Sequence, residues 1–149
     1  MPKKKMRKPP REFESLSGFS FVDENGRVRA DTSANIYESM ILSPAFMDLT
    51  SKQQVLYIFC KAQFYGKRKP GKDFPDEPRL QSDDLFYLNW DLVCNHYRLY
   101  GEKSRGHFYK DMKSLSGHGF IEIVVNGKAQ HRKNVYRFSS GWKVWKAEQ

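Results

Sequence analysis

The sequence is poor in cysteine and has no long hydrophobic run. Its two cysteines, Cys60 and Cys94, both lie among apolar residues, which is the setting of buried reduced thiols rather than of a disulfide framework. The longest purely apolar run covers residues 55 to 60, whereas a membrane-spanning helix needs about 20 apolar residues. We therefore expect a soluble intracellular protein that does not associate with membranes.

Motifs for catalysis and for metal binding are also missing. No His-x-His pair accompanies a tyrosine nucleophile, as metal-dependent strand-nicking enzymes require, and neither a phosphate loop nor Gly-x-Ser-x-Gly is present. Cys94 and His96 lack a second close pair of zinc ligands. We expect no catalytic residues, no bound metal and no cofactor.

Positive charge is the strongest compositional feature, with 26 Lys and Arg against 17 Asp and Glu among 149 residues. Residues 1 to 11 hold six basic and no acidic residues, and residues 102 to 149 hold ten basic and four acidic residues. The middle of the chain is slightly acidic. Because clustered Lys and Arg release counterions from nucleic acid, we expect a polyanionic partner, although a basic surface can also simply aid solubility.

The composition along the chain predicts three parts. Residues 1 to 11 form a disordered basic tail, which would be a DNA-binding arm in a bacterium or a nuclear-localisation patch in a eukaryote. Residues 12 to 35 form an extended arm that can make a β-hairpin around Asn25-Gly26. Residues 36 to 149 form the folded domain, which 39% hydrophobic residues can fill with one core.

Within the domain, residues 66 to 84 contain three prolines and two glycines without periodicity and are predicted to be a flexible loop. Either it is a mobile insertion, which we favour, or it is a binding loop that presents Lys67, Arg68, Lys69 and Lys72.

Local signals place two helices before this loop. Ser43-Pro44 is a helix start, and Thr50 with Gln53 fits a capping box. The second helix should run to Gly66 as a central core helix. Its apolar face is predicted to be Val55, Ile58, Phe59 and Ala62, with Leu56, Cys60 and Gln63 beside it.

After the loop, residues 85 to 88 should form a short strand, and Asn89 should cap a helix with an inward stripe of Trp90, Val93, Cys94 and Tyr97. The next helix spans residues 104 to 116, with Ser104 as a cap and Phe108, Met112 and Leu115 facing inward. Residues 120 to 125 and 134 to 139 are then paired strands, joined either by one flexible loop or by a turn at Asn126-Gly127.

This order of elements resembles the winged helix-turn-helix superfamily over about residues 40 to 142. The family pattern of an apolar residue, a leucine seven positions later, a glycine four after that and an apolar pair is matched by Phe108, Leu115, Gly119 and Phe120-Ile121. SPAFMDLTSKQQVLY is also similar to small replication and regulatory proteins of plasmids, phages and integrative elements. Two features depart from the family, the 19-residue loop and Gly106 within the recognition helix.

The resemblance implies an α+β fold, with a three-helix core, a short strand and a C-terminal β-hairpin wing. In such folds the last core helix enters the major groove, and its N-terminal residues approach base edges. We therefore assign Arg105 and His107 to base contacts and Lys103, Lys110 and Lys113 to phosphate contacts, with Tyr109 suited to either. Gly106 would allow a close backbone approach or reflect a local packing need. The alternative is that these residues form only the solvated face of a core helix.

The predicted tip of the wing is basic too. Lys128, His131, Arg132 and Lys133 would contact the neighbouring minor groove or the backbone. Lone histidines are interpreted as surface or phosphate-facing groups. The aromatic residues of the domain are expected to close its core rather than to stack on single-stranded bases; they are Trp90, Tyr136, Phe138, Trp142 and Trp145.

The predicted function is double-stranded DNA binding by a recognition helix at residues 104 to 116 and a wing at residues 120 to 139. The protein would be a replication initiator or accessory factor, or a transcriptional regulator, of a mobile element. The alternative is a winged-helix protein interaction module in a replication or conjugation complex. We expect a monomer or weak homodimer, located in the cytoplasm with the nucleoid, or in the nucleus of a eukaryote.

Overall fold

A computed structural model describes residues 8–66, 68–127 and 133–148 of the chain. The chain divides into two compact units, residues 1–33 and 34–149. In the first unit, β1 (Ser20–Val22) pairs with β2 (Val28–Ala30) as an antiparallel hairpin, as the sequence predicts. Gly26 has a φ of +77° in its turn, a conformation that glycine adopts without a steric cost.

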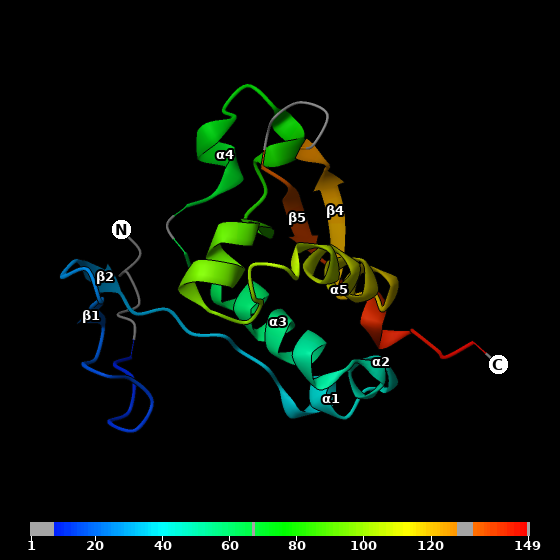
Figure 1. The fold of residues 1–149 in the computed structure, drawn as a ribbon, viewed down its shortest axis with the longest axis horizontal. Coiled ribbons are helices and arrows are strands. Elements are labelled where there is room, and N and C mark those ends of the chain that lie inside the picture. The colour runs from blue at the N-terminus through cyan, green and yellow to red at the C-terminus, as the bar shows by residue number, and fades with distance from the viewer. Residues whose placement is uncertain (1–7, 67, 128–132, 149) are drawn as a thin grey trace, which may run out of the picture. The chain divides into compact units, whose positions relative to one another are not determined.

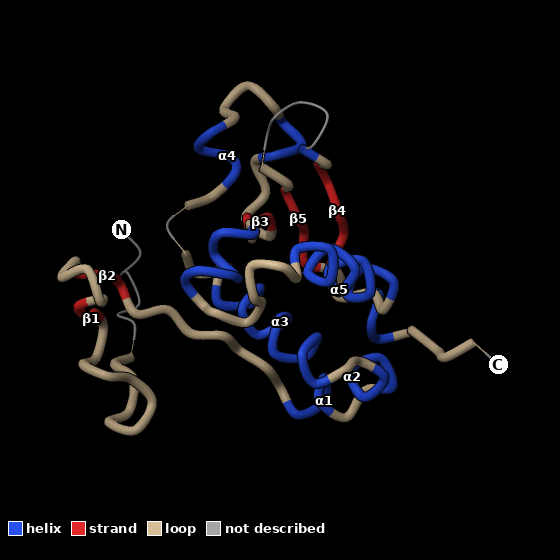
Figure 2. The backbone as a smooth tube through the Cα atoms, viewed as in Figure 1, coloured by secondary structure: helices blue, strands red, loops and turns tan. Residues whose placement is uncertain are grey.

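The second unit is an α+β structure. Figures 1 and 2 show its helices gathered beside one small sheet. Its N-terminal helices are α1 (Glu38–Ile41), α2 (Pro44–Asp48) and α3 (Ser51–Ala62). The strand β3 (Leu85–Tyr87), the π-helical turn η2 (Leu92–His96), the helix α5 (Arg105–Gly117), the strands β4 (Ile121–Val125) and β5 (Val135–Phe138), and the turn η4 (Gly141–Lys143) follow.

The sheet of this unit is antiparallel, with the strand order β3-β5-β4. Phe86 of β3 is aligned with Tyr136 of β5, and Ile123 of β4 is aligned with the same tyrosine from the other side. The predicted strand and hairpin are therefore confirmed. α3 and α5 pack against each other, and α5 packs against β4, so that the main hydrophobic core lies between these helices and the sheet.

Both predicted starts of the N-terminal helices are confirmed. The Ser43 hydroxyl accepts a bond from Phe46 N, and the Thr50 hydroxyl accepts one from Gln53 N at 3.2 Å while Gln53 Oε1 accepts one from Thr50 N at 3.0 Å. The predicted face of α3 is wrong. Leu56, Tyr57 and Cys60 are the buried side chains of this helix, whereas Val55 and Ile58 remain 36% and 39% exposed.

The reason for this error is that α3 is apolar around most of its circumference, so periodicity alone does not select the buried face. Packing selects it: the Tyr57 ring lies 4.9 Å from the Phe120 ring, in the layer between α3 and the sheet.

Cys60 and Cys94 are both buried and unbridged, as predicted. Burial raises the pKa of the Cys60 thiol well above its usual value.

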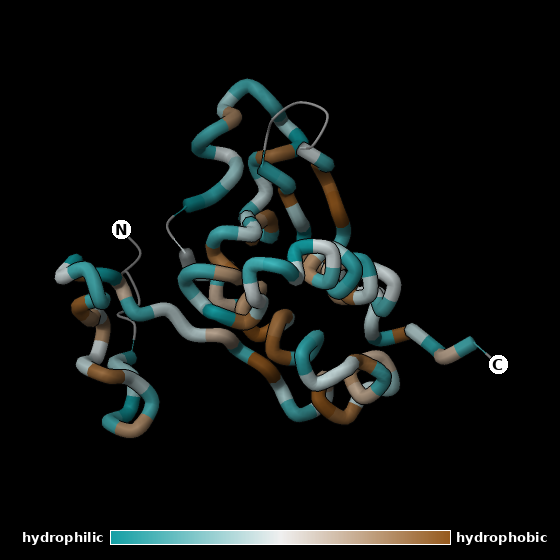
Figure 3. The backbone as a smooth tube through the Cα atoms, viewed as in Figure 1, coloured by the Kyte–Doolittle hydropathy of each residue, from teal (hydrophilic) through white to brown (hydrophobic). Residues whose placement is uncertain are grey.

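The prediction of an irregular loop at residues 66 to 84 is also wrong. The segment contains α4 (Pro70–Asp73) and the turn η1 (Pro78–Leu80). Pro70 and Pro78 each stand at the first helical position, where a missing N–H costs nothing. Leu80 is fully buried in a second apolar cluster with Leu85, Tyr87, Val125 and Val135. Figure 3 shows the rest of this segment as mostly hydrophilic, which is why its helices left no apolar period in the sequence.

The helix α5 is oriented as predicted, with Phe108, Met112 and Leu115 buried. Ser104 precedes it, but its side chain makes no capping bond, so that part of the prediction is wrong. Asn89 does accept a bond from Leu92 N at 2.8 Å, as a cap should. The helix that follows Asn89 widens into η2, and its predicted stripe is retained, with Val93 and Cys94 buried.

Asp111 is the one acidic side chain within Arg105–Gly117, and it points into the protein. Its carboxylate accepts bonds from Tyr100 Oη at 2.6 Å and from Gln53 Nε2 at 3.0 Å. Gln53 also completes the capping box of α3 with Thr50, so one amide connects the start of α3 to the middle of α5. Burial, together with the bond to Asp111, raises the pKa of Tyr100 and keeps its hydroxyl a donor.

The end of α5 is held by close backbone contacts. Gly119 has a φ of +82°, and a Cβ atom there would lie 2.4 Å from both Gly141 C and Trp142 N. Gly119 O accepts a bond from Trp142 N at 2.9 Å. Trp142 and Trp145 pack against the main core, as the sequence predicts.

His118 corrects the expectation that lone histidines face solvent or phosphate. Its Nε2 lies 2.7 Å from Asp48 Oδ2, its Nδ1 lies 2.6 Å from the Ser114 carbonyl, and its ring stacks on Trp145. The histidine therefore connects α2, α5 and the C-terminal segment.

No helix in the described part of the chain is long and apolar enough to cross a membrane.

We predict that Gly119→Ala destabilises the protein by at least about 2 kcal/mol, because the new methyl group meets backbone atoms and the residue must keep a positive φ. Urea unfolding followed by far-ultraviolet circular dichroism measures the effect. Gly117→Ala is the matched control, since a Cβ atom there meets nothing within 4 Å. Equal stability of the two variants would contradict the proposed backbone contact.

We predict that Asp111→Ala destabilises the protein by about 2 kcal/mol, because the buried Tyr100 hydroxyl is left without its acceptor. Adding Tyr100→Phe to this variant should restore part of the loss, because the orphaned hydroxyl is then removed. The free energies of unfolding of the two single variants and the double variant form a double-mutant cycle. A coupling energy near zero would show that the bond contributes nothing.

Candidate nucleic-acid interface

The basic side chains predicted on the last core helix are exposed. Lys103 precedes α5, and the predicted contact residues within the helix are all exposed: Arg105, His107, Tyr109, Lys110 and Lys113. No acidic side chain of the described residues lies within ion-pair distance of these basic groups. With Asp111 turned inward, the solvent face of α5 carries positive charge alone.

These side chains do not all share one flank of the helix. Successive residues of an α-helix are turned by about 100°, so His107 lies on the flank away from Arg105. Arg105 and Tyr109 are one turn apart and face the hairpin of β4 and β5. The guanidinium of Arg105 lies 5.9 Å from the centre of the Tyr109 ring. This cation–π contact places a charge beside an aromatic face that is 39% exposed.

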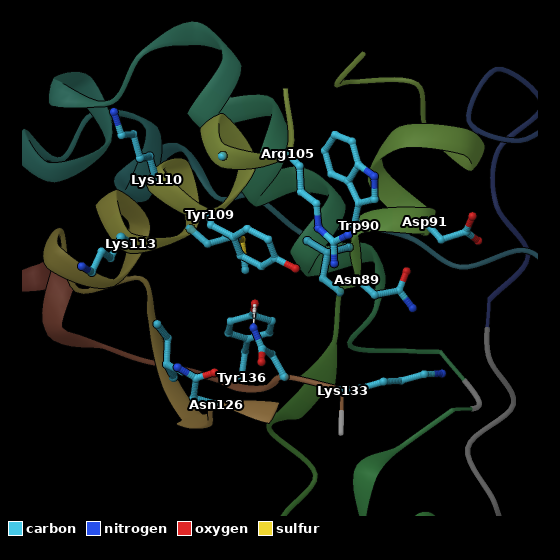
Figure 4. Close-up of a pocket in the computed structure, with 15 residues that line it drawn as sticks. Asn89, Trp90, Asp91, Arg105, Tyr109, Lys110, Lys113, Asn126, Lys133 and Tyr136 are labelled. Carbon is cyan, nitrogen blue, oxygen red and sulfur yellow. Dashed lines mark hydrogen bonds between the residues drawn. The ribbon is translucent and has the colours of Figure 1, made fainter. Parts of the chain in front are cut away.

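A hollow of about 950 Å³ lies between this flank of α5 and the β4–β5 hairpin. Figure 4 shows Arg105 and Tyr109 projecting over it from α5, with Tyr136 and Asn126 on the opposite wall. The amino groups of Lys110 and Lys113 point outward from its rim. Trp90 and Asn89 close a further side. The structure thus brings together five of the predicted contact residues, which are Arg105, Tyr109, Lys110, Lys113 and Lys133.

The wall formed by the hairpin is ordered by its own hydrogen bonds. Gly127 N donates to Asn134 Oδ1 at 2.7 Å, and Asn134 Nδ2 donates to Tyr136 Oη at 3.2 Å. Tyr136 is 1% exposed, and burial raises its pKa to about 12. Its hydroxyl hydrogen therefore stays in place at physiological pH. No acceptor for that hydrogen is found among the described residues, so it can be donated to a group in the hollow.

The charges around the hollow are mainly positive. Four of its lining residues are basic, whereas Asp91 is the one acidic lining residue in the described chain, and its carboxylate accepts a bond from Asn95 Nδ2 at 2.6 Å. Lys133 lies at the hairpin side, with its Nζ 5.6 Å from the Tyr87 ring. An anion with a flat apolar part would meet complementary groups here.

Some predicted site residues lie elsewhere. Lys103 and His107 are exposed but do not line the hollow. Lys128, His131 and Arg132 of the predicted wing tip fall outside the described residues. Arg137 of β5 is neutralised on the sheet, where it lies 3.7 Å from both Asp84 and Glu122. The described residues contain no group of His, Cys, Asp or Glu side chains that could hold a metal ion.

The sequence did not predict that asparagines would line the hollow. It also did not predict that two aromatic core residues would line it as well. Asn89, Asn126 and Asn134 line the hollow, but the sequence indicates only a helix cap at Asn89 and a turn at Asn126, and neither signal points to a site. The sequence predicts Tyr136 and Trp90 to be core residues, which is correct for their rings, yet both also line the hollow. Strand alternation could have suggested the wall, because Ile123 and Tyr136 are aligned across the hairpin.

Comparisons of the chain with protein-family models, with curated proteins and with solved structures give no match.

Proposed function

We propose that this protein binds double-stranded DNA through the exposed face of α5, assisted by the hairpin of β4 and β5. The observation that carries the proposal is the charge pattern of α5. Its exposed face is cationic without an ion-pair partner in the described chain, and its single carboxylate is bound internally by Tyr100 and Gln53. An α-helix of this kind fits the major groove, where phosphates flank the base edges.

The order of the elements supports a winged helix-turn-helix fold within the α+β class. A core helix, a short strand, a helical turn, a second long helix and a hairpin follow one another, and the first strand pairs with the last. In that fold, α5 is the recognition helix and the β4–β5 hairpin is the wing. The basic tail at residues 1 to 11 and the cations of residues 128 to 133 would add phosphate contacts.

The proposed roles of the α5 residues follow from where they point. Lys110 and Lys113 point outward from the hollow, as phosphate contacts should, and Arg105 stands at the N-terminal end of the helix, where base edges are approached. Such a protein would act in replication, as an initiator or accessory factor, or in transcription, as a regulator. A mobile element is the proposed setting.

A second candidate function is a protein interaction module. The observation that favours it is the exposure of apolar side chains on the N-terminal helices: Ile41, Leu42, Met47, Val55 and Ile58 are each at least 36% exposed. Val55 and Ile58 are three residues apart on α3 and thus share one face of that helix. Such a module would keep its affinity for a partner protein when the cations of α5 are removed.

We predict that Arg105→Ala and Lys110→Ala each weaken binding to a short DNA duplex without loss of stability. Lys110→Ala should lower the slope of log affinity against log salt concentration by about 0.9, because one phosphate contact is lost. Arg105→Ala should cost about 1–3 kcal/mol on the preferred sequence, as the loss of a base contact does. Fluorescence anisotropy at several salt concentrations measures both effects.

Lys72→Ala is the charge-matched control for these variants. Lys72 is an exposed residue of α4 and does not line the hollow, and Phe74, which follows this helix, packs against the second apolar cluster. Its removal should leave both the affinity and the salt slope almost unchanged. If the duplex is not bound at low salt, or if all three variants behave alike, α5 is not the DNA-binding element.

We predict that Gly106→Ala stabilises the protein by about 0.5–1 kcal/mol and at the same time reduces DNA affinity by about tenfold. The added Cβ atom meets nothing within 4 Å, so local packing does not require glycine at this position. A close approach of the helix backbone to DNA does require it. Thermal unfolding and anisotropy measure the two effects in parallel.

Gly117→Ala is the matched control, because this residue also lies in α5 with open space at its Cβ position. It stands at the C-terminal end of the helix and should not change DNA affinity. Unchanged DNA binding by Gly106→Ala would rule out a backbone contact at this position.

A further inference from the structure

The hollow beside α5 is lined by aromatic and hydrogen-bonding groups that the paired bases of a duplex cannot reach. Its lining includes the exposed face of the Tyr109 ring, the partly buried Trp90 ring and the hydroxyl of Tyr136. In duplex DNA the bases are stacked on one another, so a protein in the major groove meets only their edges. An aromatic face can therefore stack on a base only when that base has left the duplex stack.

The arrangement of groups fits both parts of a nucleotide. Tyr109 offers a flat surface for a base, and the Arg105 guanidinium 5.9 Å from its centre offers a charge for the attached phosphate. The Tyr136 hydroxyl, oriented by Asn134, can donate a hydrogen bond to an edge of the base. The volume of about 950 Å³ is within the range of ligand pockets and exceeds what one nucleotide needs.

Other ligand classes match fewer of these groups. The described residues offer no metal-binding group here, and an acidic peptide would pair with Arg105 but would leave the aromatic face and the oriented hydroxyl without partners. A purely apolar ligand would bury Arg105 and the lysine stems without pairing their charges. A nucleotide combines a negative charge, a planar ring and hydrogen-bonding edges, so it pairs with every class of group that the lining provides.

We infer that the hollow between α5 and the β4–β5 hairpin receives one unpaired nucleotide of DNA, with its base against Tyr109 and its phosphate at Arg105. This inference rests on the proposed function, because α5 must hold the adjoining duplex for the nucleotide to reach the hollow. It changes one role within that function, since Arg105 then contacts the phosphate of the unpaired nucleotide in the hollow instead of a base edge. The protein then prefers duplexes that contain an unpaired nucleotide, as occur where strands are opened, over fully paired DNA of the same sequence.

The experiment uses the full chain and two duplexes that differ in one feature. One duplex carries a single unpaired 2-aminopurine nucleotide, and the other carries the same 2-aminopurine opposite thymine. The expected result is about tenfold tighter binding of the first duplex, accompanied by quenching of its fluorescence as the base stacks. Tyr109→Leu should abolish both the preference and the quenching, while its affinity for the paired duplex changes less.

Two further variants sharpen the test. Tyr37→Leu is the matched control, because Tyr37 is 72% exposed and does not line the hollow, so this substitution should preserve the preference. Tyr136→Phe keeps the buried ring and removes only the hydroxyl, and it should reduce the preference several-fold without unfolding the protein. A free 2-aminopurine nucleotide is titrated in parallel and should bind far more weakly than the duplex with the unpaired base.

The outcomes separate the inference from the proposed function. Equal affinity for both duplexes, with binding still dependent on Lys110, would overturn the inference and leave duplex binding intact. Binding of the unpaired duplex alone would overturn duplex recognition and support the hollow. Equally tight binding of the free nucleotide, lost in Tyr109→Leu, would show that the site serves a free nucleotide and would overturn its assignment to a DNA strand.

Discussion

The burial of one stripe of α5 determines what the other faces of this helix can do. Phe108, Met112 and Leu115 are almost completely buried, and each such burial contributes about 1.5–3 kcal/mol. Repulsion between the exposed Lys110 and Lys113, which are three residues apart, costs only a few tenths of a kcal/mol. Packing therefore decides the orientation of the helix, and the positive face points outward although its charges repel one another.

Asp111 also helps to keep the outer face of α5 positive, because a carboxylate on that face would neutralise part of the charge of its lysines and arginine. The two hydrogen bonds from Tyr100 and Gln53 give the half-buried carboxylate partners within the protein, so the charge is not left unpaired. Gln53 also closes the capping box of α3, and thus the same amide fixes the start of one helix and the position of the other. The electrostatic character of the surface is set by a contact beneath it.

The parts of the fold that local rules govern could be predicted from the sequence. The caps at Ser43, Thr50 and Asn89, the inward stripe of α5, the glycines after it and the alternating strands each act over a few residues, and the structure contains them. The cap predicted at Ser104 is absent. The face of α3 could not be predicted, because its apolar residues surround the helix. Tertiary packing, such as that of Tyr57 against Phe120, selects the buried face. The short helices α4 and η1 were not predicted, because proline disrupts the interior of a helix, whereas Pro70 and Pro78 stand at helix starts.

The candidate site divides in the same way. The exposed cations of α5 follow from the pitch of a single helix, so the sequence was enough to find them. The hollow depends on residues from three separate segments: Trp90 precedes η2, Tyr109 belongs to α5, and Tyr136 belongs to β5. These residues come together because β5 pairs with both β3 and β4, which places Tyr136 in the same hollow as Tyr109 of α5. No periodicity of the sequence predicts this arrangement.

The two proposed components of binding depend on salt in different ways, and this difference assigns them different tasks. Contacts between lysines and phosphates weaken steeply as salt rises, and they do not distinguish one duplex from another. Stacking of a base on Tyr109 is less sensitive to ions, because it buries apolar and aromatic surface. The cations of α5 would thus govern how strongly the protein holds any DNA, while the hollow would govern where along that DNA it stays.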